Sequence, residues 1–210
     1  FQDDENDYTP DSIFPNNWVS FHQNGDVGLF PMYAKNRRLE RRPEVLEFLE
    51  SEGFTISNLV DYSSAESENK FLEGTGSMIL DRENRIAYCS ISNRSNEDLF
   101  IEFCEDFEFN PVIFNSFQSV GDKRLPIYHT NVMMCVATDY VIICLDSIDD
   151  KKQRKNVSNF IIESGKKLIE ISEKQVESFA GNMLELINEN GESILVMSNS
   201  AEDSLDENQR

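Results

Sequence analysis

The stretch Tyr128-His129-Thr130-Asn131-Val132-Met133 is one of four similar units that recur along the chain. The other three run over residues 14–19, 72–78 and 180–184. Their equivalent positions are spaced by 58, 56 and 51 residues and are Asn17, Thr75, Asn131 and Asn182. A nearly constant period of this length indicates a repeat architecture, in which each copy buries its apolar face against its neighbours.

Each unit predicts the same order of elements. An apolar strand passes through a turn-forming segment into a second strand, as in a β-hairpin. The four turns are expected at residues 23–26, 81–84, 137–139 and 188–191. Helical periodicity follows at residues 41–52, 96–107 and 151–164 and again from Ser200. Short apolar strands close three of the units at residues 55–60, 111–117 and 167–171. We therefore predict an α/β fold of ββαβ units around a common axis, with helices outside and first strands inside.

Glu73 and His129 occupy the same place in consecutive units, two residues before Thr75 and Asn131. The starts of the inner strands converge in a radial array, so these two side chains should face each other across a central pocket. A single histidine on an apolar strand is more often a core residue, and Glu73 could be a turn residue before Gly74. The shared position favours a common site, because a carboxylate that enters a buried strand is costly without a partner.

The composition predicts one globular domain over residues 1–210. A hydrophobic fraction of 39% and 15 phenylalanines are enough for a packed core. The formal net charge of −20 argues against a nucleic-acid partner, since phosphates require a basic surface. No apolar stretch has the length of a membrane span. The acidic excess, concentrated at residues 3–7 and 202–207, is expected to be mostly a solvated outer face.

The cysteines show no spacing typical of a metal site. We expect them to be reduced thiols of the core in a cytoplasmic protein rather than catalytic groups. They are Cys89, Cys104, Cys135 and Cys144.

The two ends predict a chain that is truncated. Phe1 stands where the tail of a closing strand would be, and Arg210 is expected inside a helix that lacks its partner strand. Any targeting segment would lie outside these residues.

Three motifs resemble those of the guanidino-group-modifying enzymes, the superfamily of arginine deiminases, dimethylarginine hydrolases and amidinotransferases. They are Leu72-Glu73-Gly74, Tyr128-His129-Thr130-Asn131, and Phe30-Pro31-Met32-Tyr33 followed by Arg37-Arg38-Leu39-Glu40. The runs at residues 14–18 and 179–186 are most similar to the bacterial branch that hydrolyses citrulline. The resemblance implies a five-bladed α/β propeller with an axial pocket, of which about four blades fall within this chain, and it implies no metal or cofactor.

The resemblance also implies nucleophilic catalysis by a cysteine thiolate, with a histidine that shuttles protons. His129 matches the general acid and base, and Glu73 matches the carboxylate that orients substrate and imidazole. The nucleophile of the family lies in a Gly-rich segment beyond the last helix, which this chain does not reach. The fragment alone is therefore expected to be inactive.

Two asparagines suggest the substrate class. Arginine-processing relatives carry Asp at the positions that match Asn17 and Asn131, and a neutral amide suits a neutral ureido group better than a guanidinium. Arg37 and Arg94 match the arginines that hold a substrate carboxylate, and Asn182 is the equivalent repeat position of the fourth unit. The alternatives are asparagines that only cap strands and arginines that only form surface ion pairs.

We therefore expect a hydrolase that converts the small amino acid citrulline to ornithine, carbon dioxide and ammonia. An arginine deiminase or an amidinotransferase with the same triad is the first alternative. A non-catalytic propeller that acts as a binding module is the second. The sequence gives no indication of the oligomeric state.

Overall fold

The computed structural model describes residues 9–210. The strand tail expected at Phe1 and the acidic segment at residues 3–7 lie outside the described residues.

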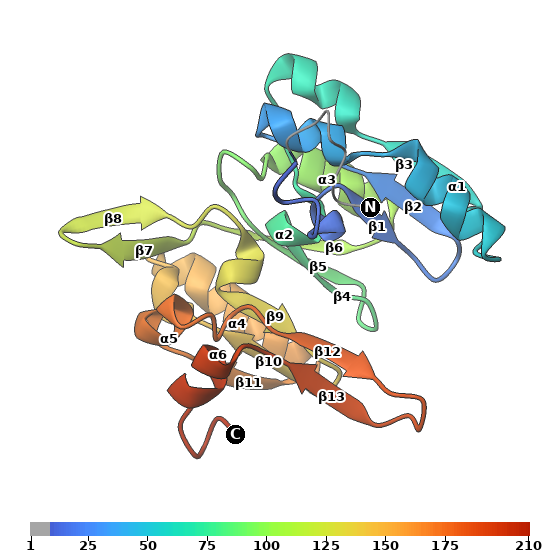
Figure 1. The fold of residues 1–210 in the computed structure, drawn as a ribbon. Helices are drawn as coiled ribbons and strands as arrows, with labels where there is room; N and C mark the ends of the chain where they lie inside the picture. Colours follow the sequence, from blue (N-terminus) through green and yellow to red (C-terminus); the bar gives the residue numbers. More distant parts are fainter. Residues whose placement is uncertain (1–8) are drawn as a thin grey trace.

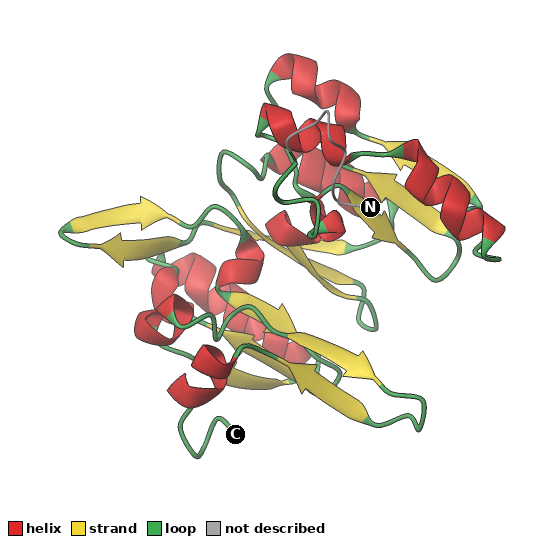
Figure 2. Cartoon of the chain, in the orientation of Figure 1, coloured by secondary structure: helices red, strands yellow, loops and turns green. Residues whose placement is uncertain are grey.

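The first unit forms a three-stranded sheet with one helix against it (Figures 1 and 2). β1 (Val19–Phe21) and β2 (Asp26–Leu29) form the predicted hairpin. α1 (Pro43–Ser51) begins at a proline, whose fixed φ and missing N–H suit the first turn of a helix. β3 (Asn58–Asp61) then pairs with β2 in the parallel sense, which completes a ββαβ unit.

The second unit repeats this order. β4 (Met78–Asp81) and β5 (Ile86–Ser90) are antiparallel, and β6 (Asn110–Phe114) pairs with β5 in parallel. Between them lies α3 (Glu97–Asp106), whose first turn is capped by Asn96 through a hydrogen bond from Leu99 N.

The third unit has the same topology. β9 (Met134–Val136) and β10 (Tyr140–Ile143) form the hairpin, and β11 (Lys167–Glu170) pairs with β10 in parallel. α4 (Lys151–Glu163) connects them and is capped by Asp150. α4 also packs against β6 of the preceding unit, so that consecutive units interlock.

The fourth unit is a two-stranded sheet followed by a short helix. β12 (Leu184–Ile187) pairs with β13 (Ser193–Val196), and α6 (Asn199–Ser204) follows. The expectation that the chain stops inside this helix is wrong. Leu205 already has an extended backbone and packs into the core, which ends α6 before the last residues.

One hairpin was not predicted. β7 (Phe117–Val120) and β8 (Lys123–Pro126) form a separate two-stranded sheet that projects from the molecule in Figure 1. The closing strand predicted to reach Phe117 ends at Phe114, because buried Ser116 turns the chain and hydrogen bonds to Ser90 Oγ at 2.7 Å. The remaining short helices are η1 (Pro15–Asn17), η2 (Lys35–Glu40), η3 (Ser63–Glu68), α2 (Gly74–Ser77), η4 (Thr130–Val132), η5 (Leu145–Ser147) and α5 (Glu173–Glu177).

The described residues contain three complete ββαβ units and a fourth hairpin, in place of the four blades expected. Their strands form five separate sheets and no closed one, so the five-bladed propeller stays a prediction. The first strands of neighbouring units do meet, β4 against β9 and β9 against β12. The segments before these strands also meet, because α2 packs against both η1 and η4.

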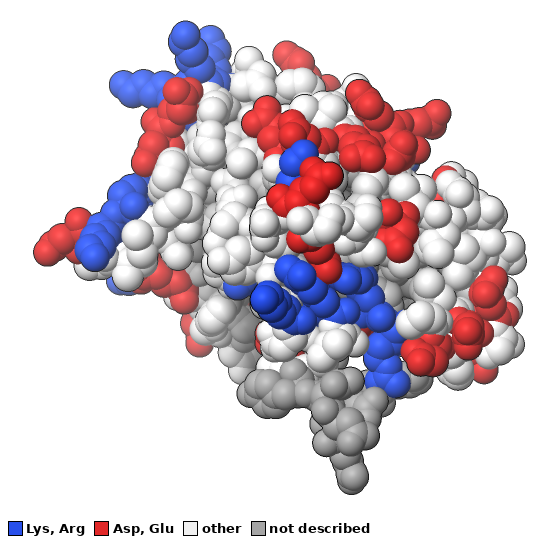
Figure 3. Space-filling view, turned by 90° about the horizontal axis from the view of Figure 1, so that it is seen from above, with Lys and Arg blue, Asp and Glu red and all other residues white. Residues whose placement is uncertain are grey.

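Charge is spread unevenly over the surface. On the face in Figure 3, a compact basic patch lies next to a broad group of acidic side chains. Some of the acidic side chains are paired, as where Glu66 lies 2.6 Å from Arg41 and 3.3 Å from Arg38. Among residues 9–210, no helix has the length and apolarity needed to cross a bilayer.

Candidate functional site

Glu73 and His129 meet where α2 and η4 pack together. His129 Nε2 lies 2.6 Å from Glu73 Oε2, and the two residues are 6% and 0% exposed. The spacing of the repeats predicted this encounter, and the distance confirms it. Each residue precedes the short helix that leads into the first strand of its unit, so the packing of those two segments brings the side chains together.

Glu73 accepts two further hydrogen bonds. The backbone N–H of Tyr33 donates to Oε1 at 2.9 Å, and Arg94 Nη1 lies 3.3 Å from Oε2. The backbone of Glu73 is held as well, because its N–H donates to Ser77 Oγ, which donates in turn to Arg94 O. The sequence reasoning missed Tyr33 and Ser77, although Ser77 belongs to the same repeat unit as Glu73.

The ionisation of the pair follows from these contacts. Burial alone would raise the pKa of Glu73, but the hydrogen bonds from His129 and Tyr33 and the charge of Arg94 hold it below its ordinary value. Burial lowers the pKa of His129, helped by Arg94 and Arg37 and opposed by Glu73. At neutral pH we therefore assign an ionised Glu73 and a neutral His129. Nε2–H donates to Glu73, and Nδ1 keeps a lone pair.

Nδ1 of His129 faces Gly76, and Asn17 Oδ1 lies against the same glycine. A Cβ at Gly76 would lie 3.0 Å from both Nδ1 and Cε1 of His129 and 2.4 Å from Asn17 Oδ1. Asn17 is 5% exposed, and its Nδ2 donates to Phe14 O at 3.1 Å. Its Oδ1 is buried and has no hydrogen-bond partner in the described structure. An acceptor without a donor is rare in a protein interior, and this one lies against Gly76, as the imidazole does.

Arg37 is buried, unlike a surface ion-pair arginine. Its Nε and Nη2 donate to Glu40 Oε1 and Oε2 at 3.0 and 2.9 Å, and Asp11 lies 3.8 Å away. This two-point contact uses the planar fork that was expected to hold a substrate carboxylate. Glu73 nevertheless acts electrostatically on Arg37, so the two groups share one region of the protein.

Arg94 contacts the carboxylate of the pair directly. Besides its contact with Glu73, the guanidinium carbon lies 5.7 Å from the ring centre of Tyr33 and 5.0 Å from that of Tyr128. Both tyrosines are partly exposed, so this group of three lies between the buried pair and the surface.

Asn131 and Asn182 are joined by a hydrogen bond to each other. Asn182 Nδ2 donates to Asn131 O at 3.0 Å, and Asn182 is exposed. Among the described residues, neither side chain hydrogen bonds to Glu73 or His129. Their substrate-binding roles stay predictions.

None of the four cysteines has the environment of a nucleophile. All are free and buried, and burial raises the pKa of each thiol, to about 12 for Cys104 and about 11 for Cys135. Within residues 9–210, no three His, Cys, Asp or Glu side chains are grouped closely enough to hold a metal ion.

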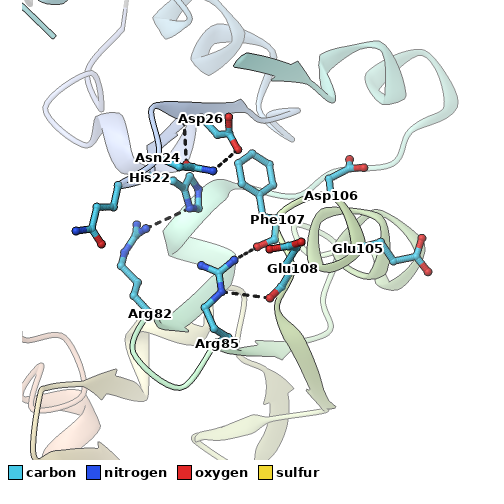
Figure 4. Close-up of a pocket in the computed structure, with 10 residues that line it drawn as sticks. His22, Asn24, Asp26, Arg82, Arg85, Glu105, Asp106, Phe107 and Glu108 are labelled. Carbon is cyan, nitrogen blue, oxygen red and sulfur yellow. Dashed lines mark hydrogen bonds between the residues drawn. The ribbon is translucent and has the colours of Figure 1, made fainter. Parts of the chain in front are cut away.

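A cavity of about 670 Å³ lies elsewhere, at the turns of the first two hairpins and the end of α3 (Figure 4). His22 accepts a hydrogen bond from Arg82 through Nδ1 at 3.3 Å, and Arg85 Nε donates to Glu108 O at 3.3 Å. Burial, with the charges of Arg82 and Arg85, lowers the pKa of His22 to about 4, so its imidazole is neutral. Neither Glu73 nor His129 lines this cavity, whose two arginines are outnumbered by four carboxylates.

The solved structures similar to this chain include an arginine dihydrolase. The arginine dihydrolase ArgZ of the cyanobacterial ornithine–ammonia cycle matches with a TM-score of 0.63 and 22% identity, over 84% of this chain and 26% of that one. Its N-terminal domain bound to substrate matches with a TM-score of 0.62 over 83% of this chain and 58% of that domain. DDAH from Pseudomonas aeruginosa, complexed with citrulline, matches with a TM-score of 0.54 and 15% identity over 83% of this chain and 58% of that one.

These likenesses are low in identity and support the fold. The chain spans only part of each of these proteins, and no curated protein sequence matches it. A family match is more specific. The description of that family is N,N-dimethylarginine dimethylhydrolase, eukaryotic, and the match covers residues 1–210. The chain therefore belongs to the eukaryotic N,N-dimethylarginine dimethylhydrolase family, within the guanidino-group-modifying superfamily.

Proposed function

We propose that this chain carries the substrate pocket and the proton-transfer groups of a hydrolase that acts on the ureido group of citrulline. The products would be ornithine, carbon dioxide and ammonia. The observation that carries the proposal is the buried Glu73–His129 pair beside an asparagine amide whose oxygen has no partner.

His129 would be the general acid and base. Its Nε2 is held by ionised Glu73, so Nδ1 is the nitrogen able to take or give a proton on the side of Gly76 and Asn17. Glu73 fixes the imidazole and stabilises it when it becomes charged. Glu73 would also accept a hydrogen bond from a substrate nitrogen.

The neutral amide of Asn17 supports a neutral substrate. Its buried Oδ1 can accept a hydrogen bond from an N–H2 of the substrate, which would satisfy the unpaired acceptor. A guanidinium would gain no counter-charge there. Asn131 is proposed to assist, and Asn182 to support Asn131 through their hydrogen bond.

The proposed role of Arg37 in holding the substrate carboxylate requires Arg37 to leave Glu40, because Glu40 occupies two of its donors. Arg94 is not engaged in a two-point contact of that kind.

The attacking thiolate would come from outside these 210 residues, since the four thiols within them are buried and have raised pKa values. We accordingly propose a catalytic domain of which residues 1–210 are a part. The free cysteines suit a reducing, cytoplasmic compartment.

Dimethylarginine is the second candidate substrate, favoured by the family match over the whole chain. Arginine is a related possibility, because structural neighbours are arginine dihydrolases. Calorimetric titration of the 210-residue protein with citrulline, arginine and N,N-dimethylarginine separates the three. Citrulline should bind most tightly. Tighter binding of a guanidinium compound would replace the citrulline proposal, and a protein that binds none of them would fit the binding-module alternative.

A further inference from the structure

The guanidinium of Arg94 lies between two aromatic rings and against the buried carboxylate of Glu73. Its Nη1 is 3.3 Å from Glu73 Oε2, and its guanidinium carbon is 5.7 Å from the Tyr33 ring centre and 5.0 Å from the Tyr128 ring centre. These three residues come from separate segments, because Tyr33 follows β2, Glu73 directly precedes α2 and Tyr128 lies just before η4. A cation between two aromatic faces is held by the ring quadrupoles.

Arg94 supplies the only full positive charge in direct contact with Glu73 among the described residues. The other two donors to this carboxylate are the backbone N–H of Tyr33 and the neutral imidazole of His129. Glu73 and Arg94 together are electrically neutral. The nearby charge of Arg37 is balanced by Glu40, which contacts it at 2.9 Å.

A substrate head group would meet this balanced set of charges. A guanidinium head group would bring a second positive charge close to Arg94 and would compete with Arg94 for the carboxylate of Glu73. Ureido brings no charge and can still donate an N–H to the carboxylate. The positive charges of Arg94 and Arg37 also act on His129, where both oppose protonation of the imidazole.

We infer that Arg94 is a specificity-determining residue that makes the site prefer a neutral ureido head over a guanidinium, by supplying the counter-charge of Glu73. This inference rests on the proposed function, in which Glu73 receives the nitrogen of the substrate. It differs from the role of Arg94 as a clamp on the substrate carboxylate. Citrulline and arginine have the same carboxylate, so loss of a clamp weakens both equally, whereas loss of a counter-charge changes their ratio.

The test compares the dissociation constants of citrulline and L-arginine by calorimetry on the 210-residue protein. Arg94→Gln should shift the ratio toward arginine roughly tenfold or more, the scale of one charge-assisted hydrogen bond. Arg94→Lys, which keeps the charge, should retain the original preference. The matched control is Arg38→Gln, because Arg38 also packs over an aromatic ring, that of Phe71, but pairs with Glu66 and not with Glu73.

A second measurement reports both whether the variant folds and how the charge near His129 changes. The imidazole of His129 is followed by NMR, and its pKa should rise in Arg94→Gln because the opposing charge is gone. If Arg94→Gln does not fold, Arg94→Met keeps much of the aliphatic stem and takes its place. Equal weakening of citrulline and arginine would overturn the inference and leave the proposed function intact. Failure of the unchanged protein to bind citrulline would overturn both.

Discussion

Gly76→Ala tests the geometry of the site most directly. A Cβ at this position would lie 2.4 Å from Asn17 Oδ1 and 3.0 Å from the His129 ring. An ordinary contact begins near 3.4 Å, so the asparagine oxygen would have to retreat by about 1 Å and the imidazole by about 0.4 Å. Neither side chain moves freely, because Asn17 Nδ2 is held by Phe14 O and His129 Nε2 by Glu73.

Both stability and binding should suffer. Overpacking of a tight interior costs about 1–3 kcal/mol of unfolding free energy. Displacement of Asn17 Oδ1 should also remove the hydrogen bond proposed between this oxygen and the substrate, which would be worth about 1 kcal/mol, so citrulline affinity should fall roughly fivefold to tenfold.

The assay pairs urea unfolding with calorimetric titration of citrulline. Gly121→Ala is the control, because a Cβ at Gly121 meets nothing within 4 Å. The positive φ of Gly121 should still cost about 1 kcal/mol of stability when alanine replaces it. The control therefore loses stability without any contact with the site, and its citrulline affinity should be unchanged. A Gly76→Ala protein that binds citrulline as tightly as the unchanged protein would refute the placement of the ureido group between Asn17 and His129.

Three further outcomes are expected. Glu73→Gln should lower the unfolding free energy by about 1–3 kcal/mol in urea titrations, because a neutral amide serves three donors poorly; an unchanged midpoint would contradict this. The pKa of His22 is lowered to about 4, so the protein should be fully stable above about pH 6.5 and should lose about 3 kcal/mol of unfolding free energy as the pH falls toward 4. His22→Gln should flatten this pH dependence of the unfolding free energy. An unaltered slope would exclude His22 as its source. The four cysteines should react with a thiol reagent only after unfolding, and rapid native-state labelling would show an accessible thiol.

The repeat period was the sequence feature that predicted most of the fold. The helices observed at Pro43–Ser51, Glu97–Asp106 and Lys151–Glu163 lie within the predicted ranges. The period also placed Glu73 against His129, because residues at the same position in consecutive units approach each other when the units pack. This prediction needed no knowledge of side-chain contacts.

Other contacts of the candidate site have no pattern in the sequence that would predict them. The donor from Tyr33 to Glu73 is a backbone N–H, which every residue except proline offers. Arg37 has several acidic candidates in the sequence, and only the fold selects Glu40 at three residues' distance. The β7–β8 hairpin has a recognisable turn at Gly121, which has a positive φ, but the closing strand predicted for the second unit takes in Phe117, the first residue of β7.

The repeat position occupied by Thr75 and Asn182 has a structural role in joining the units. Thr75 Oγ1 donates to Asn16 O at 3.4 Å, and Asn182 Nδ2 donates to Asn131 O at 3.0 Å. Each is a side chain of one unit bonded to the backbone of the preceding unit. In these two units the position therefore joins neighbouring units, and in the second and third units the residues two places earlier, Glu73 and His129, are the ones that meet. The fourth unit has Ala180 there, which carries no polar side-chain atom and so adds no side-chain hydrogen bond to the pair.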